Sequence, residues 1–140
     1  MDTPANALLR KLRDDIAPTG LPFHVDVFDV ARRQWISGVA APFPPEGFDS
    51  GFVVSLPGRE NAVEAMASGM PDLVAITDAV SDWMMDELGR GWPELADAEG
   101  RFIALLTPEA TEGGVTWVGG GHRVPVGELN TVRLVSARIE

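Results

Sequence analysis

The sequence predicts an α+β fold in which helices cover a mostly antiparallel sheet. Residues 4–16 and 71–88 carry apolar side chains at helical spacing, whereas several shorter segments alternate apolar and polar residues as strands do. The expected order is α-β-β-β-α-α-β-β-β-β. Because helices and strands do not alternate one for one, a parallel sheet is disfavoured. The 140 residues match the usual size of one domain, so we expect residues 1–140 to form a single domain.

The first helix is predicted from its start, its periodicity and its end. Thr3 provides a hydroxyl N-cap, and Pro4 suits the first helical position. Apolar side chains then recur on one face, at Leu8, Leu9, Leu12 and Ile16. Pro18 and Gly20 end the helix. We therefore expect a surface helix with one buried stripe.

Three strands are expected next, at Phe23–Val30, Gln34–Val39 and Gly51–Leu56. In the first strand, Val25 and Val27 share one face, and His24 and Asp26 share the other. Three prolines and a glycine predict that Pro42–Ser50 is an irregular loop.

Two further helices are predicted before the C-terminal strands. Asn61 and Glu64 resemble a capping pair, which predicts a short helix that stops at Gly69. The clearest element of the chain follows, a long helix at Pro71–Leu88. Its apolar residues fill one arc of a helical wheel: Leu73, Ile76, Thr77, Val80, Trp83, Met84 and Leu88. A separate arc is acidic: Asp72, Asp78, Asp82 and Asp86.

The C-terminal part is predicted to be strands, at Arg101–Leu106, Val115–Val118, His122–Val126 and Thr131–Ile139. Residues 107–114 combine Pro, Thr, Glu and Gly, which is typical of a turn. The apolar arc of the long helix is expected to pack on a sheet that includes Val25, Val27, Val53 and Phe102.

The composition restricts the classes of function. Eleven basic and 21 acidic residues give a net charge of −10, which repels phosphate backbones and anionic membrane surfaces, so we expect no direct nucleic-acid binding and no membrane binding. Most of the excess lies in residues 72–99, where eight carboxylates accompany Arg90 alone. The chain has no cysteine, no long apolar run and a charged N-terminal segment, so we expect a cytoplasmic protein without disulfides.

Residues 76–129 resemble a set of uncharacterised small bacterial proteins. The matching residues are Asp82, Trp83, Glu87-Leu88, Trp92-Pro93, Val115–Val118 with Trp117, and Val126–Leu129. In those proteins an acidic helix is followed by a Trp-Pro pair and then by a hairpin that resembles a zinc ribbon. The metal ligands of that ribbon are missing here, because their positions are occupied by Glu94-Leu95 and by the glycines after Trp117. The resemblance thus implies a hairpin held by packing, and it implies no activity. The element order also resembles that of the acidic class of bacterial secretion chaperones.

Neither a metal nor a cofactor is expected. His24 and His122 are the only histidines, and they lack the spacing of a metal motif. Asp97 and Glu99 precede a glycine as in a calcium loop, but leucines occupy the flanking ligand positions. The glycines at 119–121 lack the lysine and the hydroxyl residue of a phosphate-binding loop, so a flexible turn is expected there.

Glu87 is the one carboxylate that falls inside the apolar arc of the long helix. If it were half-buried beside Trp83, its pKa would be raised and it would suit a general acid; in the last turn of the helix it would equally reach solvent or pair with an arginine. No nucleophile elbow and no catalytic carboxylate pair is present in the sequence. These absences argue against an enzyme.

The sequence therefore favours a non-catalytic, acidic module that binds another protein, as an accessory, immunity, chaperone-like or phage-encoded protein does. Asp78, Asp82 and Asp86 are the candidate partner-binding residues, and the partner is expected to be basic. One alternative is a small-ligand binder or enzyme that uses Glu87, His24 or His122, and another is an acidic mimic of nucleic acid. The acidic arc would also serve as a solvated helix face. The oligomeric state stays open.

Overall fold

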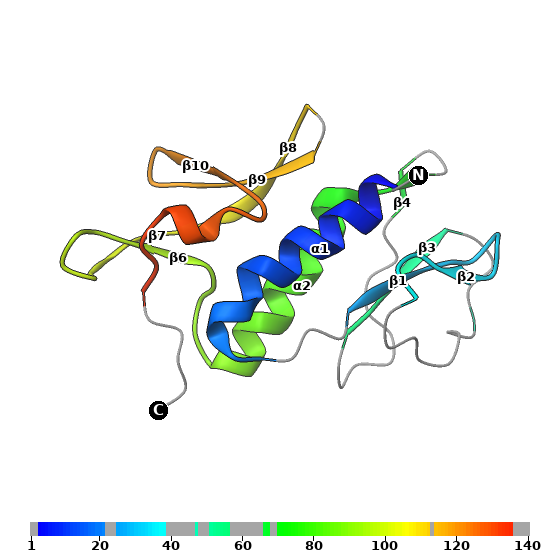
Figure 1. The fold of residues 1–140 in the computed structure, drawn as a ribbon, viewed down its shortest axis with the longest axis horizontal. Coiled ribbons are helices and arrows are strands. Elements are labelled where there is room, and N and C mark those ends of the chain that lie inside the picture. Colours follow the sequence, from blue (N-terminus) through cyan, green and yellow to red (C-terminus); the bar gives the residue numbers. More distant parts are fainter. Residues whose placement is uncertain are drawn as a thin grey trace.

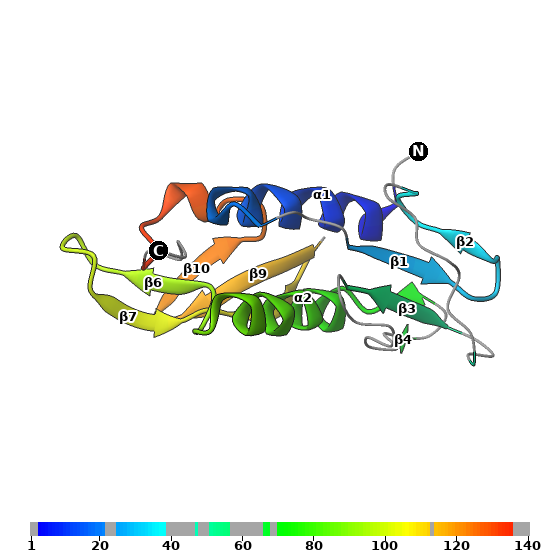
Figure 2. The same cartoon turned by 90° about the horizontal axis from the view of Figure 1, so that it is seen from below.

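The computed structural model describes residues 3–21, 25–38, 47, 51–56, 66–67, 70–112 and 114–135. Two helices, α1 (Pro4–Ile16) and α2 (Leu73–Leu88), lie alongside each other in the middle of the molecule. One group of strands lies toward one end of the helix pair and a second group toward the other (Figures 1 and 2). The α+β class and the antiparallel pairing predicted from the sequence are confirmed.

Helix α1 forms where the sequence predicts it. The hydroxyl of Thr3 accepts a hydrogen bond from the backbone N–H of Asn6 at 3.1 Å, which satisfies one of the free donors of the first turn. Beyond the helix, Ala17–Thr19 form a 3-10 turn (η1) that ends at Gly20, whose φ of 81° suits glycine. The predicted stripe is buried: Leu8, Leu9, Leu12 and Ile16.

The first sheet has the order β2-β1-β3, with β1 at Asp26–Asp29, β2 at Gln34–Trp35 and β3 at Phe52–Ser55. Val27 lies opposite Val54, and both belong to the main core. Phe28 lies opposite Val53, and these two form a separate small cluster with Val30 and Trp35 on the other face. The prediction that Val53 packs with the long helix was therefore wrong, because alternation places it on the opposite face.

The short helix predicted to end at Gly69 is contradicted in the part that the structure describes. Met66–Ala67 (β4) pairs antiparallel with Met70–Pro71 (β5), so this segment forms a small hairpin. Residues 57–65 and 68–69, like His24 and most of the predicted 42–50 loop, lie outside the described residues.

Helix α2 begins at Leu73 rather than at Pro71, because Asp72 is its N-cap. The Asp72 carboxylate accepts a hydrogen bond from the backbone N–H of Ala75 at 3.1 Å. The helix ends at Gly89, which has a φ of 68° and whose N–H donates to the carbonyl of Met85. Five residues of the predicted apolar arc are buried: Ile76, Thr77, Val80, Trp83 and Met84.

The C-terminal half holds the second group of strands. These are β6 (Glu94–Ala96), β7 (Phe102–Leu105), β8 (Thr107–Thr111), β9 (Gly114–Gly119) and β10 (His122–Pro125). Their pairing gives a sheet of order β10-β9-β8 and a β6-β7 hairpin. Residues 107–111, predicted as a turn, are thus a strand. The described part of the strand predicted at Thr131–Ile139, residues 131–135, is not a regular strand: Leu129–Thr131 form a 3-10 turn (η2), and Leu134 makes a single bridge with Leu95. Residues 136–139 of that prediction lie outside the described residues.

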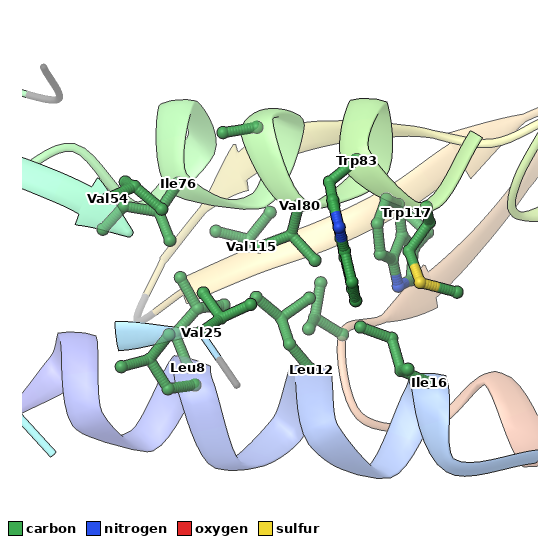
Figure 3. Close-up of a cluster of buried hydrophobic side chains, with 14 of the residues drawn as sticks. Leu8, Leu12, Ile16, Val25, Val54, Ile76, Val80, Trp83, Val115 and Trp117 are labelled. Carbon is green, nitrogen blue, oxygen red and sulfur yellow. The ribbon is translucent and has the colours of Figure 1, made fainter. Parts of the chain in front are cut away.

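The main core lies between the two helices and the two groups of strands. Figure 3 shows Leu8, Leu12 and Ile16 of α1 facing Val80 and Trp83 of α2. Val25 and Val54 close this core on the side of the first sheet, and Val115 and Trp117 of β9 close it on the other. The prediction for Phe102 was wrong, because its side chain is 57% exposed on β7.

Candidate interaction surface

Asp78, Asp82 and Asp86, here called the acidic ridge, follow one another at four-residue spacing along α2. All three are exposed. Four residues make slightly more than one helical turn, so the three carboxylates form a row of like charges on the side turned away from the core. Partial burial, and next the charge of Asp82, raise the pKa of the Asp78 carboxyl group above its ordinary value. The helix between Leu73 and Leu88 contains no basic residue.

Glu87 does not occupy the half-buried position that the helical wheel suggested. Its side chain is exposed in the last turn of α2. Helix geometry predicts the direction in which the Glu87 side chain points. The side chain is buried only if another part of the protein covers that end of the helix. The desolvation needed for the general-acid interpretation is absent, so the reading of Glu87 as a residue that reaches solvent fits better.

The histidines do not form a site in the described residues. His122 is exposed at the start of β10, where its Nδ1 lies 3.1 Å from the carbonyl oxygen of Gly120. His24 lies outside the described residues. Among the residues whose positions are described, no group of three or more His, Cys, Asp or Glu side chains could hold a metal ion.

Asp15 is a buried carboxylate that the sequence did not reveal. Its side chain is 3% exposed and accepts hydrogen bonds from Trp117 Nε1 at 3.0 Å, from the Gly127 N–H at 2.7 Å and from the Leu129 N–H at 3.1 Å. Burial raises its pKa, these three bonds oppose that rise, and the charge of Asp14 adds to it. The one local signal is its spacing of three from Leu12, which places it on the buried stripe of α1.

Asp26 is a second buried carboxylate, 2% exposed, and it too is used by the fold. It accepts hydrogen bonds from the backbone N–H groups of Val27, Ser37 and Gly38, at 2.8, 3.0 and 2.9 Å. These bonds fix the chain that follows β2 against β1. Asp15 and Asp26 both face backbone or indole donors and are shielded from solvent, so they are structural acceptors and are poorly placed to meet a substrate.

Comparison with known proteins found no protein family, no curated protein and no solved structure that matches the chain. The resemblance of residues 76–129 to small bacterial proteins therefore stays a prediction. Two tryptophans of that motif, Trp92 and Trp117, pack edge to face with ring centroids 5.6 Å apart. Within the described residues, no helix is both long and apolar enough to cross a membrane.

Proposed function

We propose that the chain is a non-catalytic interaction module that binds a basic protein partner through the acidic ridge. The observation that carries this proposal is the row formed by Asp78, Asp82 and Asp86, exposed together on a helix without a basic residue. The net charge of −10 extends the same negative potential over the chain as a whole.

The acidic ridge has an energetic cost that a basic partner would remove. Like charges four residues apart on a helix destabilise it by a few tenths of a kcal/mol per pair. The raised pKa of Asp78, caused in part by the charge of Asp82, reflects this repulsion. A cationic surface placed against the acidic ridge would turn the repulsion into attraction and would accelerate association.

The alternative of an enzyme or small-ligand binder has less support. Glu87 and His122 are both exposed, Glu87 in the last turn of α2 and His122 at the start of β10. The two buried carboxylates are already satisfied by donors of the chain itself. Glu87 and His122 therefore lack the desolvated surroundings in which catalytic groups are usually held.

The test is a pull-down from a lysate of the native host with three forms of the protein. These are the wild type, an acidic-ridge variant (Asp78→Lys, Asp82→Lys, Asp86→Lys) and a matched control (Glu109→Lys, Glu112→Lys, Glu128→Lys). The control alters three exposed carboxylates elsewhere, so both variants change the net charge equally. We expect a partner that the wild type and the control retain, that the acidic-ridge variant loses, and that salt releases. Equal retention by all three forms would contradict the proposal.

A further inference from the structure

Strand β7 carries an apolar surface for which the fold supplies little cover. Phe102, Ile103 and Leu105 are 57%, 41% and 38% exposed, and among the residues whose side-chain exposure the structure describes they are the only large apolar ones left exposed. We call these three residues the apolar strip. In the β6-β7 pairing Phe102 lies opposite Ala96 and Leu105 lies opposite Glu94, so the irregular register places Phe102 and Leu105 on one face of the hairpin. Exposed apolar side chains that gather on one face of a protein that otherwise buries such groups mark an interaction surface.

The backbone of β7 is partly covered, and this determines how a partner would bind. One edge of the strand pairs with β6. The end of β9 and the turn that follows it lie against β7: a Cβ on Gly119 would lie 2.6 Å from the Leu105 carbonyl oxygen, and one on Gly120 would lie 3.1 Å from Ile103 Cγ2. Because this turn crowds the strand, a partner would meet the exposed side chains rather than add a strand to the edge.

The apolar strip begins where α2 ends. Leu105 Cδ1 would lie 3.3 Å from a Cβ placed on Gly91, which follows the last turn of α2 by three residues. Figure 2 shows α2 and β7 following one another along the lower side of the molecule. The apolar strip therefore begins close to the end of α2 that carries Asp86.

The charges around the apolar strip indicate whether the surface of the partner is positively or negatively charged. Residues 86–106 contain five carboxylates and two arginines. Arg90 is already paired with Glu94 at 2.8 Å, which further reduces the positive charge that this region presents. A second copy of the chain would bring the same negative charges to the contact, whereas a cationic partner would neutralise them.

Resting on the proposed function, we infer that the apolar strip and the acidic ridge form one interface, occupied by a protein segment that carries an apolar stripe flanked by basic side chains. Exposed ion pairs contribute little affinity and act mainly on the association rate. Apolar side chains at the centre of an interface supply most of the binding energy. The acidic ridge would steer the partner, and Phe102, Ile103 and Leu105 would retain it.

The experiment uses two synthetic helical peptides of about 18 residues with identical lysine positions. One carries leucine along its apolar face, and the other carries serine at the same positions. Binding to the full chain is measured by calorimetry at about 0.1 M salt, where charges still act over about 10 Å. We expect the Lys–Leu peptide to bind about tenfold more tightly than the Lys–Ser peptide.

The apolar strip is then removed with Phe102→Thr, Ile103→Thr and Leu105→Thr, since threonine suits a strand. We expect the tenfold preference to vanish, while Ala98→Ser with Ala110→Ser, two exposed positions outside the apolar strip, leaves it unchanged. If the triple variant unfolds, Phe102→Thr alone changes the most exposed of the three side chains and should reduce the preference. An unchanged preference in a folded variant would overturn the inference.

Two further results separate this inference from the proposed function. The acidic-ridge variant should weaken both peptides equally; if it binds both as the wild type does, the proposed function fails even where the leucine preference remains. If the wild type is a dimer in sedimentation and the apolar-strip variant is a monomer, a second copy of the chain covers the apolar strip. The inference of a basic partner would then be wrong.

Discussion

The indole N–H of Trp117 donates a hydrogen bond to the Asp15 carboxylate at 3.0 Å, joining α1 to β9 across 102 residues of sequence. The same carboxylate holds the backbone N–H groups of Gly127 and Leu129, which follow β10. One side chain thus attaches the end of the first helix to the last part of the fold. Because an indole N–H buried without a partner is costly, Asp15 is a point on which stability depends.

Replacing Asp15 by alanine should destabilise the protein strongly. Asp15→Ala leaves three donors without their acceptor, among them the buried indole N–H of Trp117. We expect the free energy of unfolding to fall by about 2–3 kcal/mol in urea denaturation. Asp14→Ala, at the exposed neighbouring position, should change it by less than about 0.5 kcal/mol. Equal effects of the two substitutions would show that the hydrogen bonds of Asp15 are not needed.

The buried charge of Asp15 also predicts a pH dependence. Burial raises its pKa in the folded protein above the ordinary value of 3.8, so over the interval between these values the folded state binds more protons than the unfolded state. The contribution of Asp15 to stability must therefore decrease as pH rises from below 3.8 through the raised pKa, and must level off above it.

The measurement compares the free energy of unfolding of the wild type with that of Asp15→Asn across this interval. All other titrating groups are shared by the two proteins, so their effects cancel in the difference. We expect the wild type to lose stability relative to Asp15→Asn as pH rises. A relative gain would mean that the hydrogen bonds to Asp15 outweigh its burial.

Gly119 and Gly114, both on β9, provide a matched pair of substitutions. A Cβ on Gly119 would lie 2.6 Å from the Leu105 carbonyl oxygen, a backbone atom that cannot move aside alone. We expect Gly119→Ala to lower the free energy of unfolding by about 1–3 kcal/mol. A Cβ on Gly114 would meet nothing within 4 Å, so Gly114→Ala should be close to neutral. Comparable thermal midpoints for the two variants would contradict the close approach of β9 to β7.

The two helices and the acidic ridge could be predicted because their signals are local. Thr3 and Pro4 mark the start of α1, and the exposed row of aspartates in α2 follows from four-residue spacing alone. Strand β8 was missed because Pro108 and its polar neighbours are typical of a turn. In the structure β8 is the edge strand of the order β10-β9-β8, where proline is tolerated, and Pro108 lies opposite Trp117.

The hydrogen bonds of Asp15 and the exposure of the apolar strip depend on contacts that no local pattern encodes. The donors to Asp15 come from residues 102 to 114 positions later in the chain. Phe102, in a run of apolar residues, has the sequence of a buried strand. Its exposure results from the position of the β6-β7 hairpin beyond the end of α2.

The acidic ridge itself predicts a conflict between stability and binding at Asp82, which lies between Asp78 and Asp86. In Asp82→Lys two repulsive pairs become attractive, and Asp78 precedes the new lysine in the favourable order. We expect this variant to gain about 0.5–1 kcal/mol in the free energy of unfolding at low salt, and to lose most of that gain at about 1 M salt. Asp82→Asn, which only removes the repulsion, should gain about half as much. The pKa of Asp78, followed by NMR, should fall in both variants because the Asp82 charge helps to raise it.

If Asp82→Lys is no more stable than the wild type, the carboxylates do not repel each other appreciably, and the energetic argument for a basic partner fails. If it is more stable but no longer retains the partner, the acidic ridge lowers stability in favour of binding.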